Sequence, residues 1–196
     1  MQSNKFLNRF LHRNPWRQQA INWVVTVSSV FLCLLLLPAR LPGMELLGIA
    51  PNWLLIWVVA WSVKRTVVQG AIAGLILGLI QDGMTSPDPT HALGLMVVGA
   101  LTARLQKQRY VQEDFISVAL IVFGMTIVAE TIATIQFSFL QDATSGTVSF
   151  TIGKLAEIWQ YHQQIALVAA ITSSLWAPVI YYPLNYWWAR MKVLEL

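Results

Sequence analysis

The sequence predicts an all-α integral membrane protein with six transmembrane helices. The composition is the first observation, because 56% of the 196 residues are apolar and 11% are charged, whereas a soluble domain carries about 25% charged residues. The second observation is a series of six long stretches that lack charge, and a bilayer span needs about 20 such residues. High hydrophobicity excludes a disordered chain. A single cysteine, Cys33, excludes a small disulfide-built secreted domain.

The six stretches without charged residues define the expected helices. They cover 18–39, 46–63, 66–81, 89–103, 115–141 and 158–189, with Glu130 inside the fifth. The third and fourth are slightly short, so they are either spans extended by flanking Lys and Arg or core or re-entrant helices. We expect six spans in a membrane domain over 19–189. A basic cytoplasmic segment over 1–18, either an amphipathic helix or a disordered tail, precedes it, and a short cytoplasmic tail over 190–196 follows.

The basic residues predict the orientation of these spans. With the N-terminus in the cytoplasm, alternation along the chain places eleven of the 13 basic residues on the inner side. Lys and Arg concentrate on the cytoplasmic side of bacterial membrane proteins. We therefore expect both termini to be cytoplasmic. On the other side, 141–162 is expected to be the longest external loop, with a short interfacial helix built on Ile152, Leu155, Ile158 and Trp159.

Two stripes of residues four apart stand out on consecutive expected helices, namely Trp53, Trp57 and Trp61, then Gly70, Gly74 and Gly78. Glycines let two membrane helices approach closely. Since only Lys64 and Arg65 separate these helices, we expect them to be antiparallel neighbours. Either the tryptophan stripe lies in the glycine groove, or the tryptophans face lipid or a partner while the glycines meet another helix.

Two acidic residues require a structural reason. Asp82 extends the glycine stripe at the outer end of its helix, where a carboxylate opposes the helix dipole. We expect it to bond to backbone amides of the following loop, in preference to a metal site with Asp88 and His91. Glu130 lies deep in a span, where a carboxyl group is costly. It either holds a partner helix or a polar group in the bundle, or it is a neutral, hydrogen-bonded core residue.

Catalytic motifs are missing from the chain. There is no zinc-protease, nucleophile-elbow or phosphate-loop pattern and no cysteine pair. The three histidines, His12, His91 and His162, are expected to lie in separate loops, far apart. We therefore expect no enzyme, no catalytic residue, no cofactor and no metal.

One stretch carries a family resemblance. It runs through Pro51-Asn52-Trp53-Leu54-Leu55, the glycine stripe that ends in Asp82, and Gly94 in the next helix. This pattern resembles the MreD family of bacterial rod shape-determining membrane proteins. The resemblance implies a non-catalytic scaffold of the cell-elongation machinery in the inner membrane, which helps determine rod shape by linking peptidoglycan synthesis to its partners. The implied partners are an MreC-like bitopic protein, an MreB-like actin homologue, and the peptidoglycan glycosyltransferase and transpeptidase, with no nucleic acid.

The resemblance also supplies an alternative. The family fold is similar to the six-helix substrate-binding subunits of energy-coupling-factor transporters, which implies a vitamin-binding membrane subunit as the second reading. Those subunits tend to carry Ala-x-x-x-Ala on their first helix, and 21–37 has none. The scaffold is therefore favoured, and an intramembrane enzyme is third. The residues expected to pack helices or to bind partners are Trp53, Trp57, Trp61, Gly70, Gly74, Gly78, Asp82, Gly94 and Glu130.

Overall fold

The computed structural model describes residues 15–39, 43–85, 90–107, 115–145 and 152–194. Within these residues the fold is entirely helical apart from turns and one isolated bridge. The helices are α2 (Pro15–Leu36), α3 (Trp53–Ser62), α4 (Val67–Thr85), α5 (His91–Lys107), α6 (Phe115–Ser145) and α7 (Ile152–Leu194). Most of the predicted basic segment, and Asp88, lie outside the described residues.

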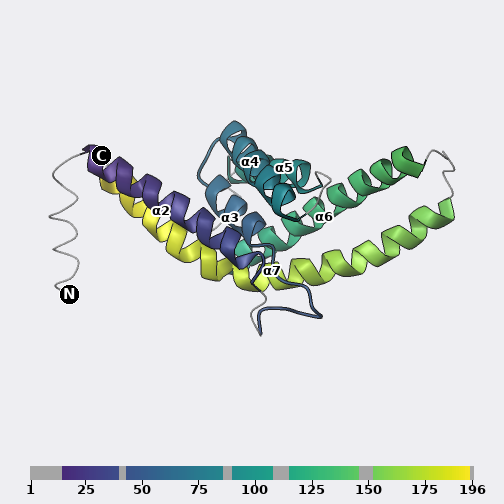
Figure 1. Ribbon diagram of the computed structural model, residues 1–196. Coiled ribbons are helices and arrows are strands. Elements are labelled where there is room, and N and C mark those ends of the chain that lie inside the picture. The colour runs from purple at the N-terminus through teal and green to yellow at the C-terminus, as the bar shows by residue number, and fades with distance from the viewer. Residues whose placement is uncertain (1–14, 40–42, 86–89, 108–114, 146–151, 195–196) are drawn as a thin grey trace.

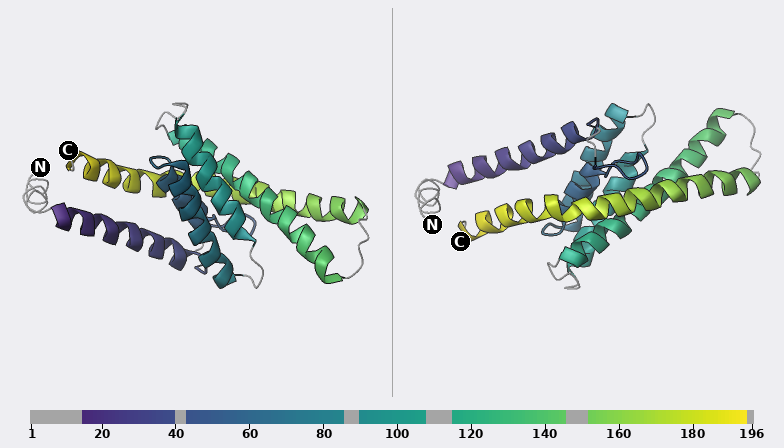
Figure 2. Two further views of the ribbon diagram at one scale, coloured as in Figure 1. Left: turned by 90° about the horizontal axis from the view of Figure 1, so that it is seen from above. Right: turned by 90° about the horizontal axis from the view of Figure 1, so that it is seen from below.

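The helices form a central group and two arms (Figure 1). Helix α7 runs the whole length of the molecule, with α2 along its C-terminal half and α6 along its N-terminal half. Helices α3, α4 and α5 pack together over its middle, as the two turned views also show (Figure 2). We call α3, α4 and α5 the hub. The first arm is α2 with the C-terminal half of α7, and the second arm is α6 with the N-terminal half of α7.

Four of the described helices are long and apolar enough to cross a membrane, which agrees with the predicted membrane protein. These spans are Trp16–Leu36, Val67–Thr85, Phe115–Phe137 and His162–Met191. Helices α3 and α5 are apolar but shorter. Six helices are therefore present in the described chain, and length alone assigns a crossing to four of them.

The second predicted span, 46–63, differs most from expectation. Its helix, α3, has 10 residues and is about 15 Å long, half the hydrocarbon thickness of about 30 Å. The residues before it turn instead, with a bridge between Leu46 and Ile49 and positive φ angles of 53° at Leu47 and 78° at Gly48. In compensation, α3 is buried from Trp53 to Ala60 and becomes the core of the hub.

The predicted external loop over 141–162 is also corrected. Helix α6 continues to Ser145 and α7 begins at Ile152, so the expected separate interfacial helix forms the first turns of α7. This helix is 43 residues long and contains Pro178 and Pro183. It curves at its middle (Figure 1). A proline inside a helix removes one backbone hydrogen bond and bends the axis, which accounts for the curvature.

Candidate helix-packing and partner-binding site

The glycine stripe of α4 packs directly on the backbone of α5. A Cβ atom added to Gly70, Gly74 or Gly78 would lie closer than 3.0 Å to backbone atoms of α5. These backbone atoms belong to Gly99, Leu95 and Ala92, respectively. The two helix backbones therefore approach so closely that no side chain fits between them, which is the contact that small residues permit in membranes.

Two further glycines of α5 complete this packing. Gly99 faces the carbonyl of Gly70, so this contact uses a glycine on both sides. Gly99 was not among the predicted packing residues, although Ala92, Leu95 and Gly99 are spaced three and four residues apart and so share one helical face. Gly94 faces the next helix, because a Cβ atom there would lie 3.2 Å from the carbonyl oxygen of Ala129 in α6. Helix α5 thus packs on α4 through Gly99 and on α6 through Gly94.

The tryptophan stripe of α3 does not lie in the glycine groove. It packs on α7 instead, since the rings of Trp53 and Trp176 are 5.8 Å apart and those of Trp61 and Trp188 are 5.2 Å apart. Trp57 stacks on Trp61 at 5.4 Å. The groove interpretation is therefore wrong, because α5 with its small residues fills the glycine face of α4.

The second interpretation is correct for the glycines and wrong for the tryptophans. The glycines meet another helix, as stated, but Trp53 and Trp57 are 4% and 3% exposed and so do not face lipid. Trp57 also donates from Nε1 to Ser29 Oγ of α2 at 2.9 Å. In parallel, Trp188 Nε1 of α7 donates to Thr26 Oγ1 at 3.4 Å. Indole groups therefore join α3, α7 and α2.

The Pro51-Asn52 pair begins α3 and ties it to α7. The Asn52 side chain accepts a hydrogen bond from Leu55 N at 3.1 Å, which is the bond of a helix N-cap. The Asn52 backbone N–H donates to Ser173 Oγ at 3.0 Å. This pair therefore fixes the residue at which α3 begins and the position along α7 at which α3 packs.

Asp82 caps the helix that follows its own. Its Oδ1 accepts from the backbone N–H groups of Thr90 and His91 at 3.2 and 2.8 Å, and its Oδ2 accepts from Ala92 N at 2.9 Å. The predicted bonding to loop amides is correct, and it extends into the first turn of α5. A carboxylate at a helix N-terminus satisfies free N–H groups and opposes the positive end of the dipole. The favourable interaction of Asp82 with the N-terminus of α5 therefore offsets its unfavourable interaction with the dipole at the C-terminus of α4.

His91 and His162 lie within helices, which corrects the expectation of histidines in separate loops. His91 begins α5 and lies 2.8 Å from Asp82 Oδ1 through its Nδ1 atom. His162 lies inside α7, and both histidines interact electrostatically with the half-buried Glu130 of α6. We call Asp82, His91, Glu130 and His162 the polar cluster. It draws one residue from each of four helices, so spacing along the chain does not reveal it.

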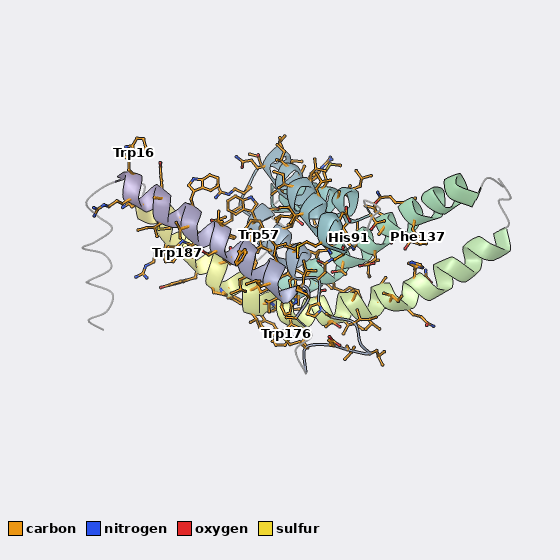
Figure 3. The ribbon with its side chains drawn as sticks, viewed as in Figure 1. Trp16, Trp57, His91, Phe137, Trp176 and Trp187 are labelled. Atoms are coloured by element: carbon orange, nitrogen blue, oxygen red, sulfur yellow. The ribbon has the colours of Figure 1, made fainter. Side chains whose placement is uncertain are left out.

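The polar cluster contributes to helix packing. Asp82 and His91 form a carboxylate–histidine pair, but the same carboxylate is engaged by three backbone N–H groups, which identifies it as a cap. In the part of the chain whose side chains are described, no three His, Cys, Asp or Glu residues gather as metal ligands would. His91 is 31% exposed. The rings of Phe137 and His162 are 6.1 Å apart, and Figure 3 labels His91 and Phe137.

An apolar slot, which the sequence pattern does not predict, lies between α2, α3 and α7. Its volume is about 430 Å³. Its walls include Cys33 of α2, Trp53 of α3, and Trp176 and Trp187 of α7. The α7 residues that line the slot recur every three or four positions on one face of the helix, from Trp176 to Trp187, and they include Pro183. The proline pair is the one signal in the sequence for a bend beside this slot.

Comparison with known proteins gives one match. The model of a family described as rod shape-determining protein MreD matches residues 17–182. No curated protein and no solved structure matches the chain.

Proposed function

The chain belongs to the MreD family of rod shape-determining membrane proteins, and we propose that it is a non-catalytic scaffold of the bacterial cell-elongation machinery. Membership implies a part in determining rod shape. The proposal goes further and assigns the chain the task of holding other components of wall synthesis together in the inner membrane.

The low burial of α2 is the observation that carries this proposal. Only 11% of its membrane span is buried inside the protein, against 39% for the span of α7. Its exposed apolar side chains include Trp23, Val27 and Phe31. A membrane helix with so few internal contacts offers most of its surface to other membrane helices, whose association depends on packing and polar contacts.

The proposed partners follow from the family. They are an MreC-like bitopic protein, an MreB-like actin homologue, and the peptidoglycan glycosyltransferase and transpeptidase. We assign the single membrane helix of the bitopic protein to the exposed face of α2. We assign its adjoining polar residues to the polar cluster, where His91 is 31% exposed. No observation favours the vitamin-transporter alternative.

Six crossings with both termini in the cytoplasm belong to the same proposal. Crossings by the four long helices alone would place nine of the 13 basic residues on the inner side, whereas six crossings place eleven there. Under this arrangement α5 and the segment that ends in α3 complete the count. A reporter enzyme fused after Leu196 should then be cytoplasmic, and one inserted near Ser145 should be external. Both reporters on the same side would contradict six crossings.

Co-purification tests the scaffold. The chain should be recovered in mild detergent with a bitopic protein that has a periplasmic coiled coil. Exposed α2 residues replaced by larger ones, as in Val27→Trp, should reduce this recovery, while Val68→Trp on the exposed face of α4 should not, because we place no partner there. Val68 is a matched control since it is 66% exposed and Val27 is 59% exposed. Recovery with paired ATPases in place of the bitopic protein would contradict the scaffold.

A further inference from the structure

The apolar slot opens toward the lipid phase. Leu32 of α2 and Val179 of α7 both line it, and they are 56% and 58% exposed. Among the described residues that line it, Ser29 carries the only hydroxyl, and this hydroxyl already accepts the indole N–H of Trp57. Because the walls are otherwise apolar, the slot offers water almost no hydrogen-bonding partner and is suited to hydrocarbon.

The slot is large enough only for a ligand that is narrower than an α-helix. An α-helix with its side chains is about 10–12 Å across and rises about 5.4 Å per turn, so 430 Å³ holds roughly one turn of helix. A partner helix therefore does not fit inside it. The α7 wall from Trp176 to Trp187 covers eleven residue steps, about 16 Å. Half of a bilayer's hydrocarbon core is about 15 Å thick, so one lipid tail matches the slot in length.

The end of the slot near Trp187 is polar, and its charge is positive. One turn beyond Trp187 on the same face of α7 is Arg190, and one turn before Val25 on the wall of α2 is Asn22. Trp187 Nε1 and Asn22 Oδ1 are both buried, and neither has a hydrogen-bond partner among the described residues. Arg17, at the same end of α2, is exposed. Buried polar atoms without partners are costly in a membrane.

We propose that the slot binds one anionic phospholipid from the leaflet on the side of Arg190. One acyl tail lies along α7 from Trp187 toward Trp176, which Figure 3 labels. The ester and phosphate groups lie at Trp187 and Arg190, and a hydroxyl group of the headgroup donates to Asn22 Oδ1. The indole N–H of Trp187 donates to an oxygen of the lipid, and the guanidinium of Arg190 pairs with the phosphate. The lipid thereby fills the space that the bend of α7 leaves between α7 and α2.

Photocrosslinking of the isolated full chain tests this site. The protein is placed in phosphatidylcholine vesicles that contain a trace of phosphatidylglycerol or phosphatidylcholine with a diazirine in the middle of one tail. We expect the phosphatidylglycerol probe to crosslink about fivefold more than the phosphatidylcholine probe. The labelled peptides should contain Cys33 and Val179, which line the slot.

Two variants and one control decide the outcome. Arg190→Gln should remove the preference for phosphatidylglycerol, and Val179→Trp should lower its yield to that of the phosphatidylcholine probe by filling the slot. Leu175→Trp is the matched control, because Leu175 is 70% exposed on the same helix and does not line the slot. Equal yields of the two probes on the wild type, or equal yields for Val179→Trp and Leu175→Trp, would overturn the proposal. Should Val179→Trp fail to fold, Arg190→Gln decides, since a preference that survives it overturns the headgroup site.

Discussion

The hub and the first arm are both built from apolar helices but differ in how these helices are held. In the hub, α3 is buried from Trp53 to Ala60, and α4 meets α5 backbone to backbone. In the first arm, only 11% of the α2 span is buried, and two indole hydrogen bonds join α2 to the rest. Lipid supplies no hydrophobic drive for helix association. Close contact and polar caps therefore stabilise the hub, while most of the surface of α2 in the arm remains exposed.

The largest expected effect comes from breaking the hub at Gly74. A leucine there has no space, because even its Cβ atom would overlap the backbone of Leu95. We expect Gly74→Leu to cost about 3 kcal/mol of stability and to lower the amount of folded protein in membranes. Gly74→Ala should lower it less. Gly124→Ala in α6 is the control, because no heavy atom lies within 4 Å of its added Cβ. Equal accumulation of Gly74→Leu and the wild type would show that this contact does not hold the hub.

A smaller effect should follow from removing the cap between α4 and α5. Asp82→Ala leaves three backbone N–H groups without their acceptor, at a cost of about 1–2 kcal/mol. Asp82→Asn keeps one oxygen acceptor and loses the charge, so its cost should be lower. The midpoint of thermal unfolding in detergent measures both. Asp82→Ala unfolding at the same temperature as the wild type would contradict the role of the cap.

The smallest effect on the chain itself should come from Glu130, which is half-buried outside the hub. Glu130→Leu should leave the protein level near normal but reduce the ratio of co-purified bitopic partner to this protein. Glu130→Gln should be mild, because an amide keeps most of the hydrogen bonding of a protonated acid. An unchanged ratio for Glu130→Leu would remove this residue from the interface. A lowered protein level would assign it to the core instead.

Sequence reasoning identifies the local features of this fold. The charge-free stretches predict all six described helices in order, and the position of Asp82 at a helix end predicts its bonds to backbone amides. Each of these features depends on residues close together in the chain. The length of α3 was not predictable in this way, since hydropathy does not distinguish the turn around Leu47 and Gly48 from a continuing helix.

Features that join distant segments were not predictable from spacing. The helix that fills the glycine face of Gly74 depends on which of several apolar neighbours has small residues opposite it. The electrostatic interaction of His91 and His162 with Glu130 involves three helices, and the slot requires the bend of α7. In each case the residues on one helix contact another helix, and the spacing of residues along the chain does not identify which helix that is.

The continuity of α7 has a mechanical consequence. At 43 residues it is about 65 Å long, twice the hydrocarbon thickness of about 30 Å, so it must tilt strongly or extend beyond the bilayer. The same rod carries both arms and is clamped at its middle by Ser173 and Trp176. Helix α7 is therefore held by the hub at its middle and carries one arm on each side of this point. A force applied to α7 where it pairs with α6 would be transmitted to the end that bears Arg190.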